Sequence, residues 1–178
     1  MAQSAAAFVE SLVKLLERAP PSSVRREIDL ERAIVPMIRR HTRRALGTND
    51  LDINDVVFTH GTTVKAKKRW TRSKADQNVL VFGCPNTSDI FIKLPGSKTI
   101  YIELKWAKHR GVKADTLPGD LQRSIGQSLI ASLRHAYVIC LVVCEHLRPE
   151  RPDDYRNKLR RLLWKKHRIA LIVRSRRP

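Results

Sequence analysis

The sequence predicts a single α/β domain, residues 1–178, with a mixed central sheet flanked by helices. Three observations carry this prediction. Residues 88–107 contain two apolar, strand-like segments joined by a Pro-Gly turn, residues 117–136 have a helical repeat, and residues 137–143 are a continuous apolar run. A short apolar run that follows a helix is typical of a strand buried on both faces. With 178 residues, 42% of them hydrophobic, the chain can form one sizeable core.

Residues 1–21 predict an amphipathic helix that docks on this core. Its apolar residues recur at helical spacing and are Phe8, Leu12, Leu15 and Leu16. Pro20 and Pro21 end the segment. The apolar run at residues 5–9 is followed directly by Glu10, so it is too short for a secretory signal, and we expect a cytoplasmic protein.

The core is predicted to span residues 24–144 and to begin with a helix over residues 24–44. Apolar residues recur among the many charges of this helix, and Gly47 supplies a stop signal. Pro36 lies inside the pattern. Because proline disrupts helical hydrogen bonding, we expect either a kink or two shorter helices.

Residues 55–70 are rich in β-branched and aromatic residues and predict a strand with a turn at Gly61. Alternate basic residues would form a ridge on one strand face, and they are Lys65, Lys67 and Arg69. Lys68 and Trp70 would lie on the other face. Residues 65–74 include six basic residues and no acidic one, which suits phosphate binding. The alternative is a merely soluble hairpin.

Residues 88–107, SDIFIKLPGSKTIYIELKWA, predict a β-hairpin that gathers charged side chains. A turn at the Pro-Gly pair would bring Asp89 opposite Glu103 or Leu104. Since strand side chains alternate, Glu103 and Lys105 share one face. Two carboxylates and an ammonium then converge, which can hold a divalent metal beside a cation that steadies an attacking water or a phosphate charge. The alternative is a solvated charge pair on an antiparallel sheet.

Residues 117–136 predict the clearest helix of the chain. Pro118 and Asp120 suit its first turn. Its apolar residues repeat every four positions and are Leu121, Ile125, Leu129 and Leu133. In the strand that follows, Cys140 and Cys144 face the same way and are expected in the core. Three cysteines without a CxxC pair indicate neither a disulfide scaffold nor a zinc site, which fits a reducing cytoplasm.

Residues 151–178 predict a basic extension made of one helix and one strand. Pro152 and Asp153 would open the helix. Its apolar stripe consists of Tyr155, Leu159, Leu162 and Leu163. Residues 168–174 predict the strand. The extension has eleven Lys and Arg against two Asp, so it carries half of the formal net charge of +18.

The net charge of +18, from 35 Lys and Arg against 17 Asp and Glu, favours a polyanionic partner. No apolar run approaches the roughly 20 residues that span a bilayer. We therefore expect duplex or branched DNA as the partner and no membrane. The predicted phosphate contacts are Lys65, Lys67, Lys68, Arg69, Arg72, Lys74, Lys108, Arg156, Arg160 and Arg161. The alternative role for these charges is solubility, although solubility does not need one sign of charge.

At the predicted hairpin the chain resembles the PD-(D/E)xK nuclease superfamily, the restriction-endonuclease-like fold that also hosts Holliday junction resolvases. The matching residues are Asp89, Glu103 and Lys105, and the resemblance covers roughly residues 29–144. It implies an α-β-β-β-α-β core in which the aspartate and glutamate hold Mg²⁺ or Mn²⁺ and the lysine assists the nucleophilic water. Ser88 stands where the name-giving pattern has proline.

The resemblance also implies further site residues. A glutamate of the first core helix often reaches the metal in this superfamily, and Glu31 is the first choice here, with Glu27 second. A glutamine on the later helix is often directed at the active site. Gln127 is the better positional match and Gln122 the second. The Leu104 carbonyl would join the metal ligands. Each of these helix residues has an ordinary alternative, a solvated or structural role.

Together these expectations describe a Mg²⁺-dependent DNA endonuclease with structure-selective or weakly sequence-specific cutting, as in junction resolution, repair or restriction. Cutting two symmetric strands would call for a homodimer. No small-molecule cofactor is expected, because the chain has no Gly-rich phosphate loop, no GxSxG and no HExxH. Two alternatives remain: a non-catalytic nucleic-acid-binding protein of the same fold, and a small basic RNA-binding protein.

Overall fold

The computed structural model describes residues 4–18, 26–47, 52–59, 64–107, 117–144 and 155–175. Its helices are α1 (Ala5–Arg18), α2 (Glu27–Leu46), α3 (Val64–Gln77), α4 (Leu117–Ser132) and α5 (Arg156–His167), with 3-10 turns at Ile53–Asp55 and Pro95–Ser97. Its strands are β1 (Val57–Thr59), β2 (Val79–Val81), β3 (Cys84–Asn86), β4 (Ile90–Lys93), β5 (Thr99–Ala107), β6 (Tyr137–Cys144) and β7 (Ile169–Ser175). Within these ranges no helix is both long and apolar enough to cross a membrane.

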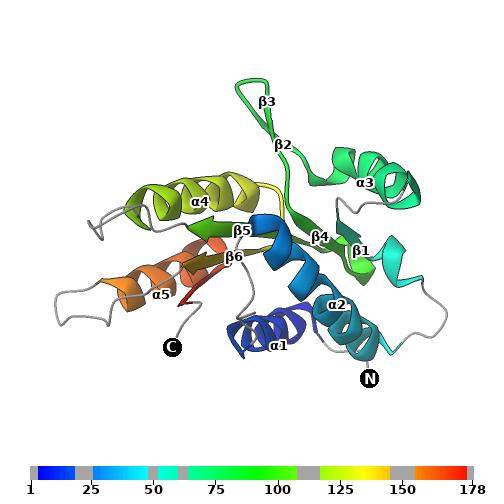
Figure 1. Ribbon diagram of the computed structural model, residues 1–178, viewed down its shortest axis with the longest axis horizontal. Helices are drawn as coiled ribbons and strands as arrows, with labels where there is room; N and C mark the ends of the chain where they lie inside the picture. The colour runs from blue at the N-terminus through cyan, green and yellow to red at the C-terminus, as the bar shows by residue number, and fades with distance from the viewer. Residues whose placement is uncertain are drawn as a thin grey trace.

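A mixed five-stranded sheet organises the fold (Figure 1). Its strand order is β1-β4-β5-β6-β7. Strands β1, β4 and β5 are antiparallel neighbours, whereas β5, β6 and β7 run parallel. Helices α1 and α2 pack on one face of the sheet, and α4 and α5 pack mainly on the other. This arrangement confirms the predicted α/β class with a mixed central sheet flanked by helices.

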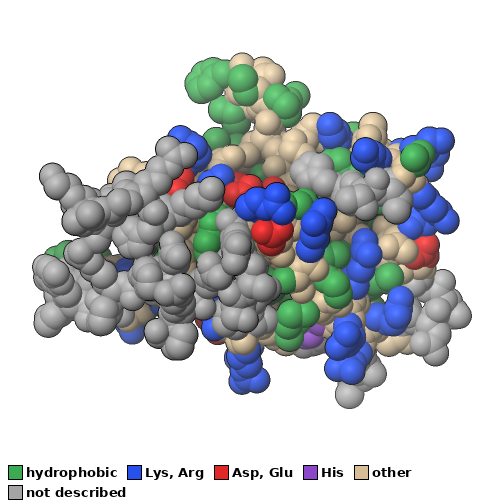
Figure 2. All heavy atoms as spheres, in the orientation of Figure 1, with side chains coloured by type: hydrophobic (Ala, Val, Ile, Leu, Met, Phe, Trp, Pro, Cys, Tyr) green, Lys and Arg blue, Asp and Glu red, His purple; other side chains and the backbone are tan. Residues whose placement is uncertain are grey.

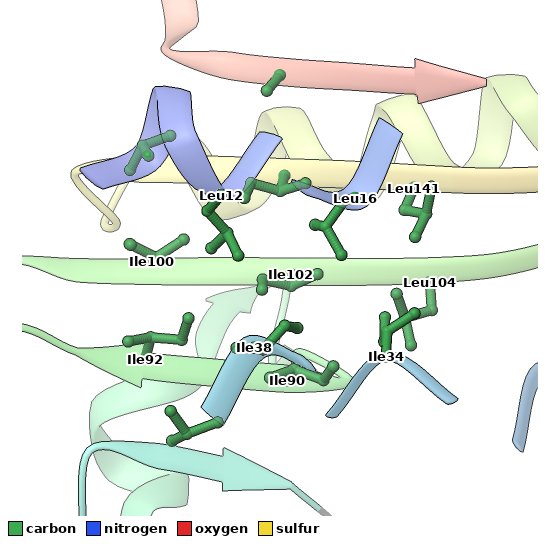
Figure 3. Packing of buried hydrophobic residues seen from close by; sticks show 14 of the residues in the cluster. Leu12, Leu16, Ile34, Ile38, Ile90, Ile92, Ile100, Ile102, Leu104 and Leu141 are labelled. Carbon is green, nitrogen blue, oxygen red and sulfur yellow. The ribbon is translucent and has the colours of Figure 1, made fainter. Parts of the chain in front are cut away.

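The sheet face under α1 and α2 carries the larger apolar core (Figure 3). The side chains that meet there include Leu12, Leu16, Ile34, Ile38, Ile90, Ile100, Ile102 and Leu104, all of them fully buried. Burial of this apolar surface is the main favourable contribution to folding, at about 25 cal/mol per Å². Strand β5 supplies every second side chain to this core, so Tyr101 packs on the opposite face with the second apolar cluster.

The last strand anchors the N-terminal helix. The buried residues of α1 are Phe8, Val9, Leu12 and Leu16, in agreement with the predicted amphipathic pattern. Ala170 and Ile172 of β7 belong to the same core as these residues. The guanidinium of Arg174 also donates a hydrogen bond to the Leu16 carbonyl, at 3.1 Å. The two ends of the described chain are therefore held together.

Helix α2 continues through Pro36 as one helix, so the expectation of two shorter helices is wrong. Pro36 is exposed, whereas the buried residues on both sides of it, Leu30, Ile34, Ile38 and Thr42, dock on the same sheet. This packing outweighs the lost helical hydrogen bond. Gly47 ends the helix as predicted, with φ of 63° and its N–H bonded to the Arg43 carbonyl.

The predicted strand over residues 55–70 is largely wrong. Among the described residues of this segment, Val57–Thr59 is the strand, and Val64–Gln77 is helix α3. Trp70, Ser73 and Gln77 are the buried residues of α3, and their spacing of three and four residues gives the helix one inward face. The three-residue ridge predicted for Lys65, Lys67 and Arg69 on a strand face therefore does not exist. On the helix, Lys65 and Arg69 are four residues apart and share a side, where both line one cleft, whereas Lys67 lies on another side.

Strand β7 makes the predicted C-terminal extension part of the central sheet. It pairs with β6 from Val138 opposite Ile169 to Cys144 opposite Ser175. As predicted, β6 is buried along its length, and the thiols of Cys140 and Cys144 are free and buried. The predicted helix opening at Pro152 and Asp153 lies outside the described residues, and α5 begins at Arg156.

Two predicted apolar stripes are only partly buried. In α5, Leu163 lies in the core and Leu159 packs against it, whereas Tyr155 and Leu162 are 71% and 47% exposed. The sheet therefore covers only part of the apolar side of α5 that the sequence pattern predicts. In α4, the helix ends before the fourth position of the repeat, and Leu133 is exposed.

A second, two-stranded sheet is inserted in the chain between strands β1 and β4 of the main sheet. Strands β2 and β3 form an antiparallel hairpin that follows α3 and stands away from the body of the protein (Figure 1). Its turn consists of Phe82 and Gly83, both with positive φ. The hairpin ends next to β4, so it leads directly into the segment that carries Asp89.

Candidate active site

The antiparallel pairing of β4 and β5 places Asp89 beside Glu103. Ile90 lies opposite Ile102 in the register, and the Asp89 N–H donates to the Ile102 carbonyl at 3.0 Å. The Asp89 carboxylate in turn accepts a 2.7 Å hydrogen bond from the Leu104 N–H. The turn between the strands lies at Pro95–Ser97. These contacts confirm the predicted hairpin and bring Asp89 to the position opposite Glu103.

Glu103 is a buried carboxyl group on the second sheet face. It is 5% exposed, and the Tyr101 hydroxyl donates a hydrogen bond to it at 3.3 Å. Burial, and then the charge of Asp89, raise the pKa of Glu103 to about 8. Burial also raises the pKa of the Tyr101 phenol, so this group stays protonated and remains a donor.

The pKa of the Asp89 carboxyl group is raised as well. Burial raises its pKa to about 7, opposed by the Leu104 N–H and assisted by the charges of Glu27 and Glu31. Two partly desolvated carboxyl groups that repel one another favour either protonation or a bound cation. Their neighbourhood therefore suits a divalent metal with oxygen ligands.

The start of α2 brings a third carboxylate to the site. The Glu27 carboxylate lies 3.3 Å from the Lys105 ammonium and accepts a long 3.5 Å hydrogen bond from the Trp106 N–H. Glu31 lies one turn further along α2, and burial is the largest cause of its raised pKa. Glu27, the second choice from the sequence, is thus the helix glutamate that contacts Lys105.

Helix α4 places Gln127 and Gln122 differently. Gln127 is half-buried, and its side-chain oxygen is buried without a hydrogen-bond partner in the described part of the chain. Its backbone carbonyl accepts a 2.9 Å hydrogen bond from the Asn86 side chain. Asn86 also accepts a hydrogen bond from the Tyr101 hydroxyl at 3.3 Å. Gln122 is exposed.

Sequence reasoning missed Tyr101 and Asn86. Tyr101 was detectable, because it lies two residues before Glu103 in a strand and so must share its face. Asn86 carried no local signal, because its contact with Tyr101 depends on how the β2–β3 hairpin packs against the main sheet.

The donor set fits a magnesium ion in part. Among the described residues, no three Asp, Glu, His or Cys side chains form a ready metal cluster. Mg²⁺, however, commonly binds through one or two carboxylates and keeps several waters. Asp89 and Glu103 supply two such groups, and the repulsion that raises their pKa values would be relieved by a cation.

Replacing Asp89 by asparagine is expected to stabilise the metal-free protein. The pKa of Asp89 is higher in the folded protein than in the unfolded chain. Its contribution to the free energy of unfolding is therefore most favourable below about pH 4 and is lost as the pH rises to about 7. In Asp89→Asn, the free energy of unfolding at pH 8 should therefore increase by about 1–3 kcal/mol. Denaturant unfolding in the presence of chelator at pH 5 and pH 8 measures this change in the free energy of unfolding. The increase should be larger at pH 8 than at pH 5.

The control is Asp76→Asn, which changes an exposed aspartate paired with Lys93 on the surface. A surface pair contributes little, so its stability should change by less than about 1 kcal/mol at either pH. A loss of stability in Asp89→Asn at both pH values would contradict the assigned repulsion.

The predicted phosphate contacts of α3 fall into two groups. Lys65, Lys67, Lys68, Arg72 and Lys74 are exposed. Arg69 instead pairs with Asp52 at 2.7 Å and Asp55 at 3.4 Å, so it serves an internal contact between α3 and the preceding segment. Figure 2 shows Lys and Arg side chains spread over the face of α2 and α3, with acidic side chains beside basic ones near its centre.

The remaining predicted contacts lie at the other end of the protein. Arg156, Arg160 and Arg161 are on α5, where Arg161 is exposed and the other two are half-exposed. Lys108 lies outside the described residues. The two groups of basic residues therefore lie on α3 and α5, with the acidic site between these helices (Figure 1).

A cleft of about 500 Å³ lies between α2, β1 and α3. Glu31 lines it together with basic side chains, namely Arg32, Arg39, Lys65 and Arg69. Burial is the largest cause of the lowered pKa of Arg39, and its Nε has no hydrogen-bond partner among the described residues. The cleft thus combines several basic side chains with the carboxylates of Glu31 and Asp52, and Asp52 pairs with Arg69.

Asp89, Glu103 and Lys105 make their contacts with strands β4 and β5 and helix α2. No protein-family model matches this sequence, and neither the curated proteins nor the solved structures include a significant match.

Proposed function

We propose that this protein is a metal-dependent DNA endonuclease of the PD-(D/E)xK type that hydrolyses phosphodiester bonds with structure-selective or weakly sequence-specific cutting. One observation carries the proposal: the half-buried carboxyl group of Asp89 and the buried one of Glu103 are neighbours where β4 pairs with β5, with Lys105 two residues further on. Raised carboxyl pKa values in such a cluster mark a candidate functional site.

The order of elements supports the same proposal. Helix α2, strands β1, β4 and β5, helix α4 and strand β6 follow one another in the order helix, three strands, helix, strand. Helix α3 and the β2–β3 hairpin are inserted between β1 and β4. The inserted elements leave the pairing of β1, β4 and β5 intact.

In the proposed mechanism, Asp89, Glu103 and the Leu104 carbonyl would hold Mg²⁺ or Mn²⁺. The metal would lower the pKa of a bound water and stabilise charge on phosphate oxygens. Lys105 positions the attacking water or neutralises developing negative charge. Glu27 orients the Lys105 ammonium through the 3.3 Å ion pair, and Tyr101 holds Glu103 by its hydrogen bond.

A cleavage assay tests the proposal. Supercoiled plasmid, linear duplex, branched DNA and RNA are each incubated with the protein in Mg²⁺, Mn²⁺ or chelator. We expect metal-dependent cutting of DNA, strongest on branched or supercoiled molecules, and none in chelator. Sedimentation with bound duplex would test the proposed homodimer, which brings one site to each strand.

The second candidate is a non-catalytic nucleic-acid-binding protein of the same fold. The ion pair between Lys105 and Glu27 favours it, because this pair keeps the ammonium engaged within the protein. Tight binding of DNA without cleavage in any metal would support this candidate. Preferential binding and cutting of RNA would support an RNA-directed role instead.

The exposed basic residues on α3 are expected to contribute to DNA-binding affinity and not to the cleavage step. Lys65, Lys68 and Arg72 are spaced by three and four residues and so share one side of α3. Replacing all three by alanine should weaken binding to many sequences alike. Each lost contact should reduce the slope of log affinity against log salt by roughly 0.9 on B-DNA.

The matched variant replaces Arg156, Arg160 and Arg161 on α5. Binding is measured over a salt series for both triple variants, and cleavage is measured at saturating DNA, where it should survive. If affinity and salt slope are unchanged in both triple variants, these charges serve solubility.

A further inference from the structure

The β2–β3 hairpin ends in an exposed apolar tip. The Phe82 side chain is fully exposed, and Leu80 on the adjoining strand is 69% exposed. Residues 79–86, VLVFGCPN, contain no charged residue, although 29% of the chain is charged. The hairpin stands clear of the body, with apolar side chains at its outer end (Figures 1 and 2). Nothing in its packing explains a phenylalanine there.

The backbone at the tip makes phenylalanine an unfavourable choice. Val81 lies opposite Cys84, so Phe82 and Gly83 form a two-residue turn, with φ of 50° and 78°. Two-residue hairpin turns with both φ values positive favour Asn, Asp or Gly. A bulky residue with positive φ is strained, and such strain is retained when the surroundings or the function require it. Because the Phe82 side chain is fully exposed among the described residues, its packing does not explain the strain, and a functional role would.

The base of the hairpin is fixed to the candidate active site. The Asn86 side chain donates to the Gln127 carbonyl on α4 and accepts a hydrogen bond from the Tyr101 hydroxyl. The same hydroxyl lies 3.3 Å from the Glu103 carboxyl group, so its one proton is shared between Asn86 and Glu103. The tip is therefore carried at a defined position relative to the carboxylates.

Basic residues lie at the start of the hairpin, where the nearby Asp76 carboxylate is paired with Lys93. The Arg134 guanidinium donates a 2.6 Å hydrogen bond to the Asn78 carbonyl at the start of the hairpin. The N–H of Asn78 in turn donates to the Lys74 carbonyl at the end of α3, where Lys74 and Arg72 are exposed. An apolar tip flanked by cations matches a partner with an anionic outside and an apolar interior, which is the character of stacked nucleic acid.

We propose that Phe82 is a wedge that inserts into the base stack of bound DNA at a branch or distortion, so that the β2–β3 hairpin selects substrates whose stacking is already interrupted. Inserted apolar side chains unstack base steps at a cost in energy, and this cost is lowest where pairing is already broken. The inference rests on the proposed function only in taking DNA as the partner, because insertion requires no cleavage.

The test uses a four-way junction and a linear duplex of the same sequence, each with 2-aminopurine beside the branch position. Chelator is present throughout, so that no cutting occurs. The full-length protein should raise the fluorescence of the junction probe, which reports unstacking, and leave the linear probe nearly unchanged. Phe82→Asn should abolish the rise and weaken junction binding about tenfold, the effect of one lost stacking contact. Binding to linear duplex should change by less than about twofold.

Phe82→Asn should fold, because asparagine suits a turn residue with positive φ, and its thermal unfolding should be no lower than that of the unchanged protein. Phe82→Ala is the second variant and should lose the fluorescence signal as well. The matched control is Leu162→Asn, the same kind of change at an exposed apolar residue of α5, and it should retain the signal.

Several results would overturn the wedge. Equal fluorescence and junction affinity in Phe82→Asn and the unchanged protein would do so directly. Loss of a dimer in sedimentation, or of binding to anionic lipid vesicles, in Phe82→Asn with unaltered junction binding would assign the tip to self-association or a lipid surface. Metal-dependent cleavage without a fluorescence change would reject the wedge alone, whereas a fluorescence change without cleavage would reject the nuclease and retain the wedge.

Discussion

Glu103→Gln and Asp89→Asn should each reduce DNA cleavage at least about a thousandfold, because each removes one of the two charged ligands proposed for the metal. The substitutions keep the size of the side chains. Asparagine at position 89 can still accept a hydrogen bond from the Leu104 N–H, and glutamine at position 103 can still accept one from the Tyr101 hydroxyl. The fold should therefore persist, and single-turnover cleavage at saturating DNA and Mg²⁺ measures the loss.

Two controls separate chemistry from folding. Circular dichroism and DNA binding in chelator should be close to those of the unchanged protein for both variants. Asp76→Asn, an exposed aspartate in a surface ion pair, should cleave normally. Full activity of either purified site variant would remove Asp89 or Glu103 from the metal site.

Lys105→Ala should slow cleavage at least about a hundredfold, while duplex binding changes by less than about tenfold. The Lys105 side chain is 22% exposed and its ammonium lies 3.3 Å from the Glu27 carboxylate, so the side chain is placed for chemistry and offers little surface for a phosphate contact. Single-turnover rates and equilibrium binding in Ca²⁺ measure the two effects separately. Comparable losses in rate and in affinity would make Lys105 an ordinary phosphate anchor.

Glu27→Gln is the companion variant. It removes the charge that holds Lys105 but leaves the lysine in place, so the rate should fall less than in Lys105→Ala. If Glu27→Gln is as slow as Glu103→Gln, Glu27 belongs among the metal ligands. This comparison also decides between Glu27 and Glu31 as the helix residue of the site.

The hairpin that carries Asp89 and Glu103 could be predicted because its signals are local. Alternating side chains and a Pro-Gly turn determine which residues face one another, and the observed register agrees. The buried strand β6 was equally readable from its apolar run. In these segments the preference of the chain and the tertiary packing point to the same structure.

Helix α3 and the Glu27–Lys105 contact could not be predicted from local pattern. Alternating basic residues at 65, 67 and 69 are compatible with a strand, and only burial of Trp70, Ser73 and Gln77 shows that a helix prevails. Propensity is a weak guide when tertiary packing decides. The ion pair from α2 to β5 joins distant parts of the sequence, so no short-range pattern could choose between Glu27 and Glu31.

The docking of α1 on β7 sets an order of events during synthesis. Phe8, Leu12 and Leu16 are synthesised well before Ala170, Ile172 and Arg174, which help to cover and hold them. Contacts between distant parts of a chain form slowly, and exposed apolar surface invites aggregation in the meantime. Until β7 has been made, the apolar face of α1 therefore lacks part of the cover that it has in the folded protein.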